Sequence, residues 1–280
     1  GNRNWAPYLD DVLAEAARDG VRRMIAIPTS AYSSYSSCRQ YREDWADALE
    51  AAGLQERLQV DKVRQFFSHP GFVEPFIEGV RDGIAAAERA GHARASIEVL
   101  FSTHSIPTAD AARSGAGLFA DVDGGGYAAQ HLAVASEVMA AAAPDISWRL
   151  VYQSRSGAPS VPWLEPDVND AIAALVARTA ILIVPIGFVS DHLEVLWDLD
   201  REARETAEGA GLWMGRVATP GVHPAFVAAL VDLVEERIVG RPVAQRANVT
   251  SLGPWFDVCR PGCCAKGGAA ARFAIAGLAP

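Results

Sequence analysis

Three acidic residues at four-residue intervals, Glu194, Asp198 and Glu202, have the types and spacing best suited to chemistry in this chain. They lie in the stretch SDHLEVLWDLDRE, directly after the apolar run 181–188. If this stretch is helical, the three carboxylates share one face, although like charges at this spacing repel each other. Carboxylate oxygens are suited to holding a divalent cation. We therefore predict a cation path here, with a plain solvated helix face as the alternative.

His104 is the second candidate, in the stretch FSTHSIP, and it follows the apolar run 95–102. A neutral imidazole accepts a proton near pH 7 or binds a transition metal. Combined with Glu194 it would form a mixed nitrogen and oxygen site for a first-row metal. The alternative is a loop histidine that is bonded to the backbone.

The third group lies in the stretch YQSRSGAPSVPWLEPDV, which contains Tyr152, Arg155 and Trp163. Aromatic side chains and a guanidinium beside one crevice favour a flat, apolar ligand with negative charge. The alternative is an ordinary loop whose tryptophan packs into the core.

The four cysteines form the last group: Cys38 lies in a loop rich in Ser and Tyr, and Cys259, Cys263 and Cys264 lie in CRPGCCAKG. Four thiols could form two disulfides, but nothing in the sequence indicates an oxidising compartment. Four thiolates could instead hold a zinc ion or a [2Fe–2S] cluster. Adjacent cysteines suit a single tetrahedral zinc less well than two irons.

The elements that must position these groups alternate between strands and helices. This alternation predicts an α/β fold made of two doubly wound, Rossmann-like domains with parallel sheets, which bind ligands at the carboxyl ends of their strands. We expect domains at 1–92 and 93–245 and a cysteine-bearing tail at 246–280. The expected strands are 21–28, 58–63, 95–102, 148–153, 181–186 and 212–217, and the expected helices are 7–19, 39–52, 72–90, 128–142, 168–179, the acidic stretch and 224–239.

Composition narrows the class of protein. The 280 residues carry a net charge of −9, which argues against nucleic acid as a partner. No stretch of eighteen uncharged apolar residues exists, and no signal peptide is visible, so we expect a cytoplasmic monomer without a transmembrane segment. The chain opens with GNRNW rather than Met, from which we expect that the beginning of the first domain is missing.

Together the motifs resemble the ferrochelatase family over nearly the whole chain, from Gly1 to about residue 240. FSTHSIP is similar to the family's histidine signature, PIGFVSDHLEVLWDLDRE to its acidic signature, and YQSRSGAPSVPWLEPDV to the loop between them. The resemblance implies a chelatase-type fold with a truncated first domain. It also implies a lyase of heme biosynthesis that inserts Fe²⁺ into a porphyrin and releases two pyrrole protons.

The resemblance also implies residue roles. His104 would bind the metal or accept a proton, and Glu194 would face it from the opposite side of the ring. Asp198 and Glu202 would be outer relay positions on a helix widened into a π turn. The porphyrin pocket would include Arg3, Tyr32, Ser33, Tyr152 and Trp163. The cysteine pattern resembles actinobacterial coproporphyrin ferrochelatases, which implies coproporphyrin III as the ring and a [2Fe–2S] cluster on Cys38, Cys259, Cys263 and Cys264.

Two other classes of function stay open. One is a non-catalytic carrier of metal or tetrapyrrole on the same frame, and the other is an Fe–S redox sensor in which the cysteines are the function. Cobalt insertion into a sirohydrochlorin-type ring fits less well, because those enzymes resemble this chain less in the loop around Trp163.

Overall fold

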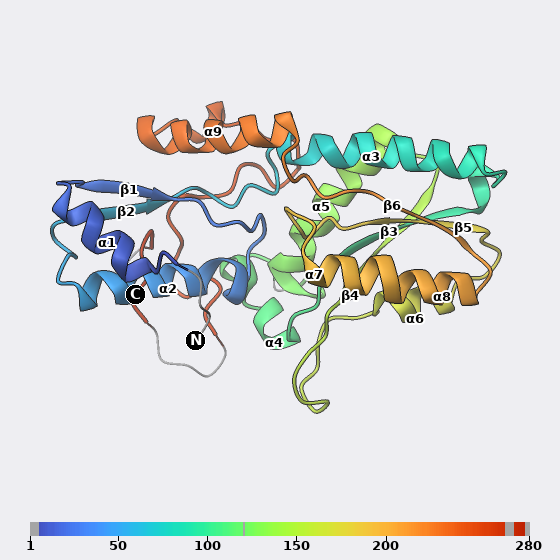
Figure 1. The fold of residues 1–280 in the computed structure, drawn as a ribbon, viewed down its shortest axis with the longest axis horizontal. Helices are drawn as coiled ribbons and strands as arrows, with labels where there is room; N and C mark the ends of the chain where they lie inside the picture. Colours follow the sequence, from blue (N-terminus) through green and yellow to red (C-terminus); the bar gives the residue numbers. More distant parts are fainter. Residues whose placement is uncertain (1–5, 120, 267–271, 278–280) are drawn as a thin grey trace.

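Two parallel sheets organise the computed structural model, which describes residues 6–119, 121–266 and 272–277. The smaller sheet pairs β1 with β2, and the larger has the strand order β4-β3-β5-β6 (Figure 1). The doubly wound α/β class predicted from the sequence is confirmed. The strands are β1 (Arg23–Ala26), β2 (Gln59–Lys62), β3 (Ile97–His104), β4 (Ser147–Gln153), β5 (Ala180–Val184) and β6 (Trp213–Arg216).

The larger sheet is covered on both faces. Because side chains alternate along a strand, Val99 and Phe101 of β3 enter one core while Leu100 enters the other. The first core is closed by α3 (Pro70–Arg89) and α5 (Gly125–Ala142). The second is closed by α6 (Val168–Ala173), a π-helix (Leu196–Ala203) and α8 (Arg204–Gly209). Burial of both faces explains the continuous aliphatic run of β5.

The smaller sheet is covered on one face by α1 (Leu9–Arg18) and α2 (Gln40–Ala51), together with Ile275 of the tail. A second π-helix (Tyr35–Arg39) leads directly into α2. Within the described part of the chain, no helix is long and apolar enough to cross a membrane.

Two long helices begin with the same local device. His69 precedes Pro70 at the start of α3, and His223 precedes Pro224 at the start of α9 (Pro224–Val239). Proline suits the first turn of a helix, where its missing N–H has no partner to lose. Each histidine accepts a hydrogen bond at Nδ1 from the backbone N–H two residues later, at 3.1 Å for His69 and 3.2 Å for His223.

Each of these two helices packs on the sheet that the other half of the chain forms. α3 follows β2 along the chain, yet it packs on β5 and β6 of the larger sheet. α9 follows β6, yet it lies over the smaller sheet, where Arg237 donates to Asp61 of β2 at 2.6 Å (Figure 1). The division into domains at 92/93 and 245/246 stays a prediction. α3 and α9 each pack on a sheet from the other side of the 92/93 boundary.

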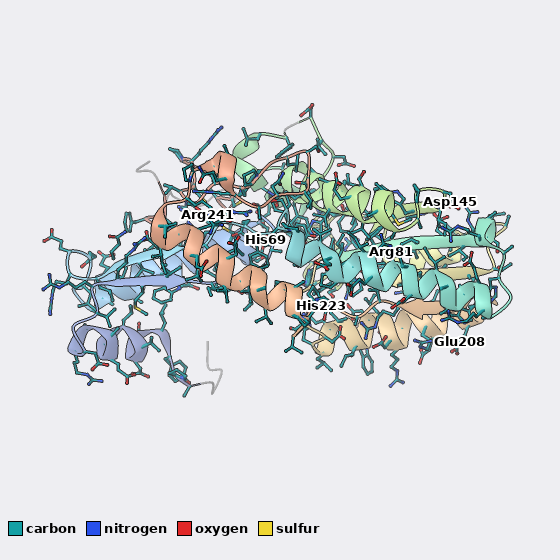
Figure 2. The ribbon with its side chains drawn as sticks, turned by 90° about the horizontal axis from the view of Figure 1, so that it is seen from above. His69, Arg81, Asp145, Glu208, His223 and Arg241 are labelled. Atoms are coloured by element: carbon teal, nitrogen blue, oxygen red, sulfur yellow. The ribbon has the colours of Figure 1, made fainter. Side chains whose placement is uncertain are left out.

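Contacts between α3 and α9 are reciprocal. His69 Nε2 donates to Asp232 Oδ2 of α9, and His223 Nε2 donates to Glu78 Oε2 of α3, each at 3.1 Å. Viewed from above, both histidines lie along the line where the two helices meet (Figure 2). The Nδ1 atoms accept hydrogen bonds, so the ring protons lie on Nε2.

Two local expectations were wrong. The helix expected at 168–179 ends at Ala173, and it could not reach residue 179 because Ala177 has a φ of 58° that an α-helix does not permit. The strand expected at 95–102 continues through His104, so this histidine ends the strand rather than following it. The acidic stretch begins as a short α7 (Leu193–Val195) and continues as the π-helix, as the family resemblance implies.

Candidate functional site

A cleft of about 940 Å³ lies at the carboxyl ends of β1, β3 and β5, where the parallel-sheet pattern predicts a ligand site. Its walls are the loop after β1, the segment from His104 to Pro107, the loop after β5 and one side of α9. The volume is at the upper end of the range for small-molecule sites, about 300–1,000 Å³. A large, flat ligand is therefore accommodated without opening the core.

His104 is held in one tautomer by its backbone. Its Nδ1 lies 2.5 Å from the carbonyl oxygen of Ser105, and a carbonyl only accepts, so Nδ1 carries the proton. Nε2 consequently keeps its lone pair. The Tyr127 hydroxyl donates to the carbonyl of His104 at 2.9 Å and fixes the end of β3. The histidine therefore presents a basic nitrogen to the cleft.

Glu194 lies directly beside that nitrogen. Its Oε2 is 3.9 Å from His104 Nε2, and the two side chains are 56% and 36% exposed. Since nitrogen and oxygen ligands bind first-row metals at about 2.0–2.2 Å, one ion between the two atoms would reach both. The expectation that Glu194 faces His104 across a ring stays a prediction; a flat ring between the two atoms needs about 7 Å, more than the 3.9 Å that separates them here.

The outer acidic residues have different surroundings. The half-buried Asp198 accepts hydrogen bonds from Gln153 Nε2 at 3.1 Å and from the Ser154 hydroxyl, both at the end of β4. The exposed Glu202 accepts from Trp197 Nε1 at 2.9 Å. A π-helix bonds residue i to i+5, and π turns are frequent at functional sites. The four-residue spacing thus falls on a wider turn than an α-helix provides.

Arg216, at the end of β6, clamps the acidic segment and was not predicted. Its Nε donates to Asp200 Oδ1 at 2.6 Å and its Nη1 to Asp191 Oδ1 at 3.0 Å. The two aspartates flank Glu194, so the guanidinium joins the loop before Glu194 to the π-helix after it. The sequence holds no short-range signal for this contact, which spans sixteen residues to Asp200 and twenty-five to Asp191.

Two of the predicted pocket aromatics line the cleft. The ring centre of Trp163 is 6.5 Å from that of His104, and its buried Nε1 has no hydrogen-bond partner among the described residues. Tyr32 also borders the cleft but is only 1% exposed, because its ring stacks on His131 at 3.5 Å. Burial lowers the pKa of His131 to about 3.

Ser33 and Tyr152, two further predicted pocket residues, are not among the residues that line the cleft. Ser33 bonds Gln130 of α5 through both its backbone N–H (2.8 Å) and its hydroxyl (3.0 Å). Tyr152 is 6% exposed and packs in the core around α3 and α5. Arg3 lies outside the described residues. Sequence reasoning missed Tyr127, because its helix carries no recognisable motif.

The four cysteines are free and buried, and each contacts the next in the series Cys38, Cys259, Cys263 and Cys264. Cys263 and Cys264 have sulfur atoms 3.7 Å apart. A hydrogen bond with Cys259 and burial raise the pKa of Cys38, and Cys259 in turn bonds Cys263. The thiols thus form one group drawn from the π-helix Tyr35–Arg39 and the tail.

The distances between the sulfur atoms of the four cysteines indicate which kind of metal group they could hold. Among the described residues, no three cysteines bring their sulfur atoms within 4.8 Å of one another. A tetrahedral zinc with Zn–S bonds of about 2.3 Å would need all four sulfurs about 3.8 Å apart. A two-iron cluster distributes its ligands over two metals and tolerates the wider spacing. The donor set therefore fits a [2Fe–2S] group better than a single zinc.

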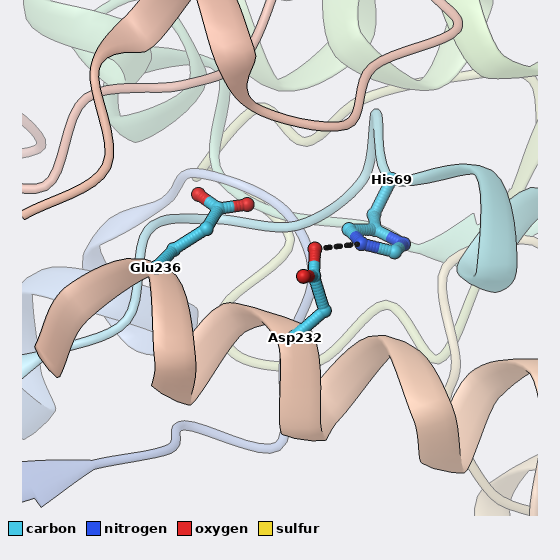
Figure 3. A group of neighbouring side chains, drawn as sticks. All are labelled: His69, Asp232 and Glu236. Carbon is cyan, nitrogen blue, oxygen red and sulfur yellow. Dashed lines mark hydrogen bonds and ion pairs between the residues drawn. The ribbon is translucent and has the colours of Figure 1, made fainter. Parts of the chain in front are cut away.

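His69, Asp232 and Glu236 form the one group of three ligand atoms that lie within 4.8 Å in the described chain (Figure 3). Their donor atoms are already used. Both oxygens of Glu236 accept from Arg64 at 3.0 Å, and Asp232 accepts from Arg241 at 2.7 Å. Two guanidiniums at this position favour an ion-pair network over a cation site.

Comparison with known proteins identifies the family of this chain. The family model described as Ferrochelatase matches residues 1–238. The chain belongs to the ferrochelatase family. A "Coproporphyrin III ferrochelatase" of Leifsonia xyli is 59% identical over 291 residues, covering 100% of this chain and 75% of the relative. A protein of the same name from Tropheryma whipplei is 53% identical, and the match covers 100% of this ferrochelatase-family chain and 72% of the relative. Another from Streptomyces griseus is 51% identical, with 94% of this chain and 72% of the relative covered.

Solved structures agree on the fold. "SirB from Bacillus subtilis with Fe3+" superposes with a TM-score of 0.55 at 11% identity, over 85% of this chain and 82% of SirB. The sirohydrochlorin chelatase SirB in complex with cobalt gives 0.52 at 12% identity, over 89% and 82%. At these identities the likeness shows the chelatase fold alone. The two parallel sheets of this ferrochelatase-family chain are thus those of a chelatase.

Proposed function

We propose that this chain is a coproporphyrin III ferrochelatase, which inserts Fe²⁺ into coproporphyrin III and releases two pyrrole protons in heme biosynthesis. The observation that carries the proposal is the pairing of His104 Nε2 with the Glu194 carboxylate at 3.9 Å in a cleft of about 940 Å³. The substrate is taken from the names of relatives that are 51–59% identical and covered over 72–75% of their length.

His104 and Glu194 have different proposed roles in iron insertion. Iron insertion requires that both pyrrole protons leave as the metal enters. His104 has its proton fixed on Nδ1, so Nε2 accepts a pyrrole proton without a prior tautomer change. Glu194 offers a carboxylate oxygen next to that nitrogen, either as a ligand for the entering Fe²⁺ or as the acceptor of the second proton.

Asp198 and Glu202 are proposed as outer relay positions. Asp198 lies four residues beyond Glu194 on the π-helix and already accepts hydrogen bonds from Gln153 and Ser154. Glu202 is exposed, as the solvent end of a relay must be. Of the pocket residues Trp163 and Tyr32 border the cleft, which supports ring contact for them. Ser33, Tyr152 and Arg3 stay predictions.

We further propose that Cys38, Cys259, Cys263 and Cys264 hold a [2Fe–2S] cluster. Their mutual contact, burial and spacing support this donor set. When bound, the group would tie the tail covalently to the π-helix that begins α2. The residues of this chain provide the thiolates and the surrounding charge.

The test is a metallation assay with Fe²⁺ and coproporphyrin III, followed by absorption of the metallated ring. We expect His104→Ala and Glu194→Ala to lose insertion by a factor of 10² or more while their far-UV circular dichroism is unchanged. His92→Gln, which replaces a histidine bonded to Thr179 away from the cleft, is the matched control and keeps the wild-type rate.

Two results would contradict the proposal. Near-normal insertion by either alanine variant removes the assigned roles of His104 and Glu194. Ring binding by the wild type without any metallation indicates a carrier instead. Running the assay with protoporphyrin IX in parallel tests the choice of ring.

A further inference from the structure

Among the described residues, the buried arginine and lysine side chains have carboxylate partners, with two exceptions. Arg64, 1% exposed, is bonded by Glu236 at both oxygens, and Arg39, 8% exposed, pairs with Glu43 at 2.7 Å. Arg42 and Lys62 are each 1% exposed, and neither lies within 4.0 Å of a carboxylate among the described residues. Burying an uncompensated charge costs several kcal/mol, so these two cations need an explanation.

Their hydrogen bonds are to neutral groups. Arg42 Nε donates to the carbonyl of Ile275 at 2.7 Å, and its Nη1 is buried with no partner in the described chain. Lys62 Nζ donates to the carbonyl of Val63 at 2.6 Å and to Gln65 Oε1 at 2.9 Å. Carbonyl and amide oxygens satisfy the donors but do not balance the charge.

The groups beside both cations that can become negative are thiols. Arg42 Nη2 lies beside Gly277, where an added Cβ would be 2.5 Å away, and Gly277 pairs with Cys259 in a parallel bridge. Lys62 and Arg42 are also the two cations that act to lower the pKa of Cys38. The same two cations act on Cys259. Arg42 is also tied to the cysteine-bearing tail, since Ile275 N–H donates to its carbonyl at 3.1 Å.

We propose that Arg42 and Lys62 balance the negative charge of a [2Fe–2S] cluster held by Cys38, Cys259, Cys263 and Cys264. The inference rests on the cluster proposed above. Four thiolates, two sulfides and two ferric ions carry two negative charges, and one-electron reduction adds a third. The positive charges of Arg42 and Lys62 then balance the cluster. The net charge of this buried site is closest to zero when the cluster is present.

This placement has a direct electrochemical consequence. A fixed positive charge stabilises the reduced cluster more than the oxidised one, because the reduced cluster carries one more negative charge. Removing either cation therefore makes reduction harder, and the midpoint potential becomes more negative. Replacing it with the other cationic side chain keeps the charge and restores the potential.

The test is a spectroelectrochemical titration with dithionite of the full chain after anaerobic reconstitution with iron and sulfide. We expect Arg42→Gln and Lys62→Gln each to lower the reduction equilibrium constant at least tenfold, which is about 59 mV for one electron. Arg42→Lys and Lys62→Arg return most of that shift. Arg81→Gln removes an exposed arginine that bonds a backbone carbonyl (Figure 2), and it leaves the potential unchanged.

The outcomes separate the two proposals. If the wild type acquires no cluster absorption, both the [2Fe–2S] assignment and this inference fail. If the cluster forms and the Gln variants keep the wild-type potential, the cluster stands and the charge-balancing role is overturned. Should Arg42→Gln fail to fold because it loses its bond to the tail, Lys62→Gln decides the question alone.

Discussion

A single backbone carbonyl determines what His104 can do. The carbonyl of Ser105 accepts from Nδ1, so the lone pair of the neutral ring lies on Nε2. The residue and its place at a strand end were predictable, since both follow from a local pattern of apolar and polar residues. The tautomer was not, because it depends on where one carbonyl points after the chain has turned.

His131 provides a prediction at the same scale. It is fully buried between Tyr32 and Tyr127, and burial lowers its pKa from 6.5 to about 3. Between those values the unfolded chain binds a proton that the folded chain does not. Stability from this group is therefore complete above about pH 6.5 and is lost as the pH falls toward 3. At pH 5 the loss is about 2 kcal/mol.

Denaturant unfolding at pH 7 and pH 5 measures this loss. His131→Gln is less stable at pH 7 but loses about 2 kcal/mol less than the wild type on acidification. His192→Gln, which replaces an exposed histidine, serves as the control. An unchanged acid slope in His131→Gln would rule out this residue as the source.

At the scale of elements, the site depends on how the π-helix is attached. Arg216 of β6 bonds Asp191 before Glu194 and Asp200 after it. Its side chain is 14% exposed, so the pairs are better shielded from solvent than surface ion pairs, which contribute little. The clamp fixes both ends of the segment that carries Glu194, the carboxylate for which we propose a catalytic role.

We expect Arg216→Ala to lower the free energy of unfolding by about 1–3 kcal/mol and the iron-insertion kcat about tenfold. Two carboxylates would remain beside each other without a counter-charge. Arg201→Ala is the matched control, because its pair with Glu205 is 60% and 66% exposed, and it changes stability by less than about 0.5 kcal/mol. Equal effects of the two variants on kcat would show that the clamp is unimportant.

Element positions were largely predictable and element partners were not. Apolar runs located all six strands, and the polar groups after β3, β4 and β5 meet at one edge because parallel strands end together. The π-helix was expected only from the family resemblance, since the intrinsic pattern of Glu194, Asp198 and Glu202 is that of an α-helix. The ion pairs of Arg216, and the lack of a carboxylate beside Lys62 among the described residues, result from contacts between distant segments. No local sequence pattern encodes such contacts.

At the scale of the whole molecule, α3 and α9 make the two sheets interdependent. Each helix closes the sheet that belongs to the other half of the chain, and reciprocal histidine–carboxylate bonds join them. Gly71 of α3 approaches so closely that an added Cβ would lie 2.3 Å from the carbonyl oxygen of Ala225. Neither half can lose its helix without uncovering a core in the other.

The molecule should therefore unfold in one cooperative transition. Fluorescence and far-UV circular dichroism in denaturant should give coincident curves. Gly71→Ala should shift both curves equally, by about 1–3 kcal/mol, because it overpacks the contact between the helices. Gly209→Ala, at a position with open space around the added Cβ, leaves both curves in place or stabilises them slightly. Two separated transitions would mean that the sheets unfold independently.

The exchanged helices also matter while the protein is being made. The chain emerges from the ribosome in order, and the face of the smaller sheet that α1 and α2 do not cover stays open after Lys62 until α9 ends at Val239. At about 5–20 residues per second this interval is on the order of ten to forty seconds. During that time the sheet face that α9 later covers, which carries Ile25 and the Arg23–Asp61 pair, and the two strand edges are open to other chains. A holding chaperone acting on the nascent first half would then protect the yield of this protein more than any change to its finished fold.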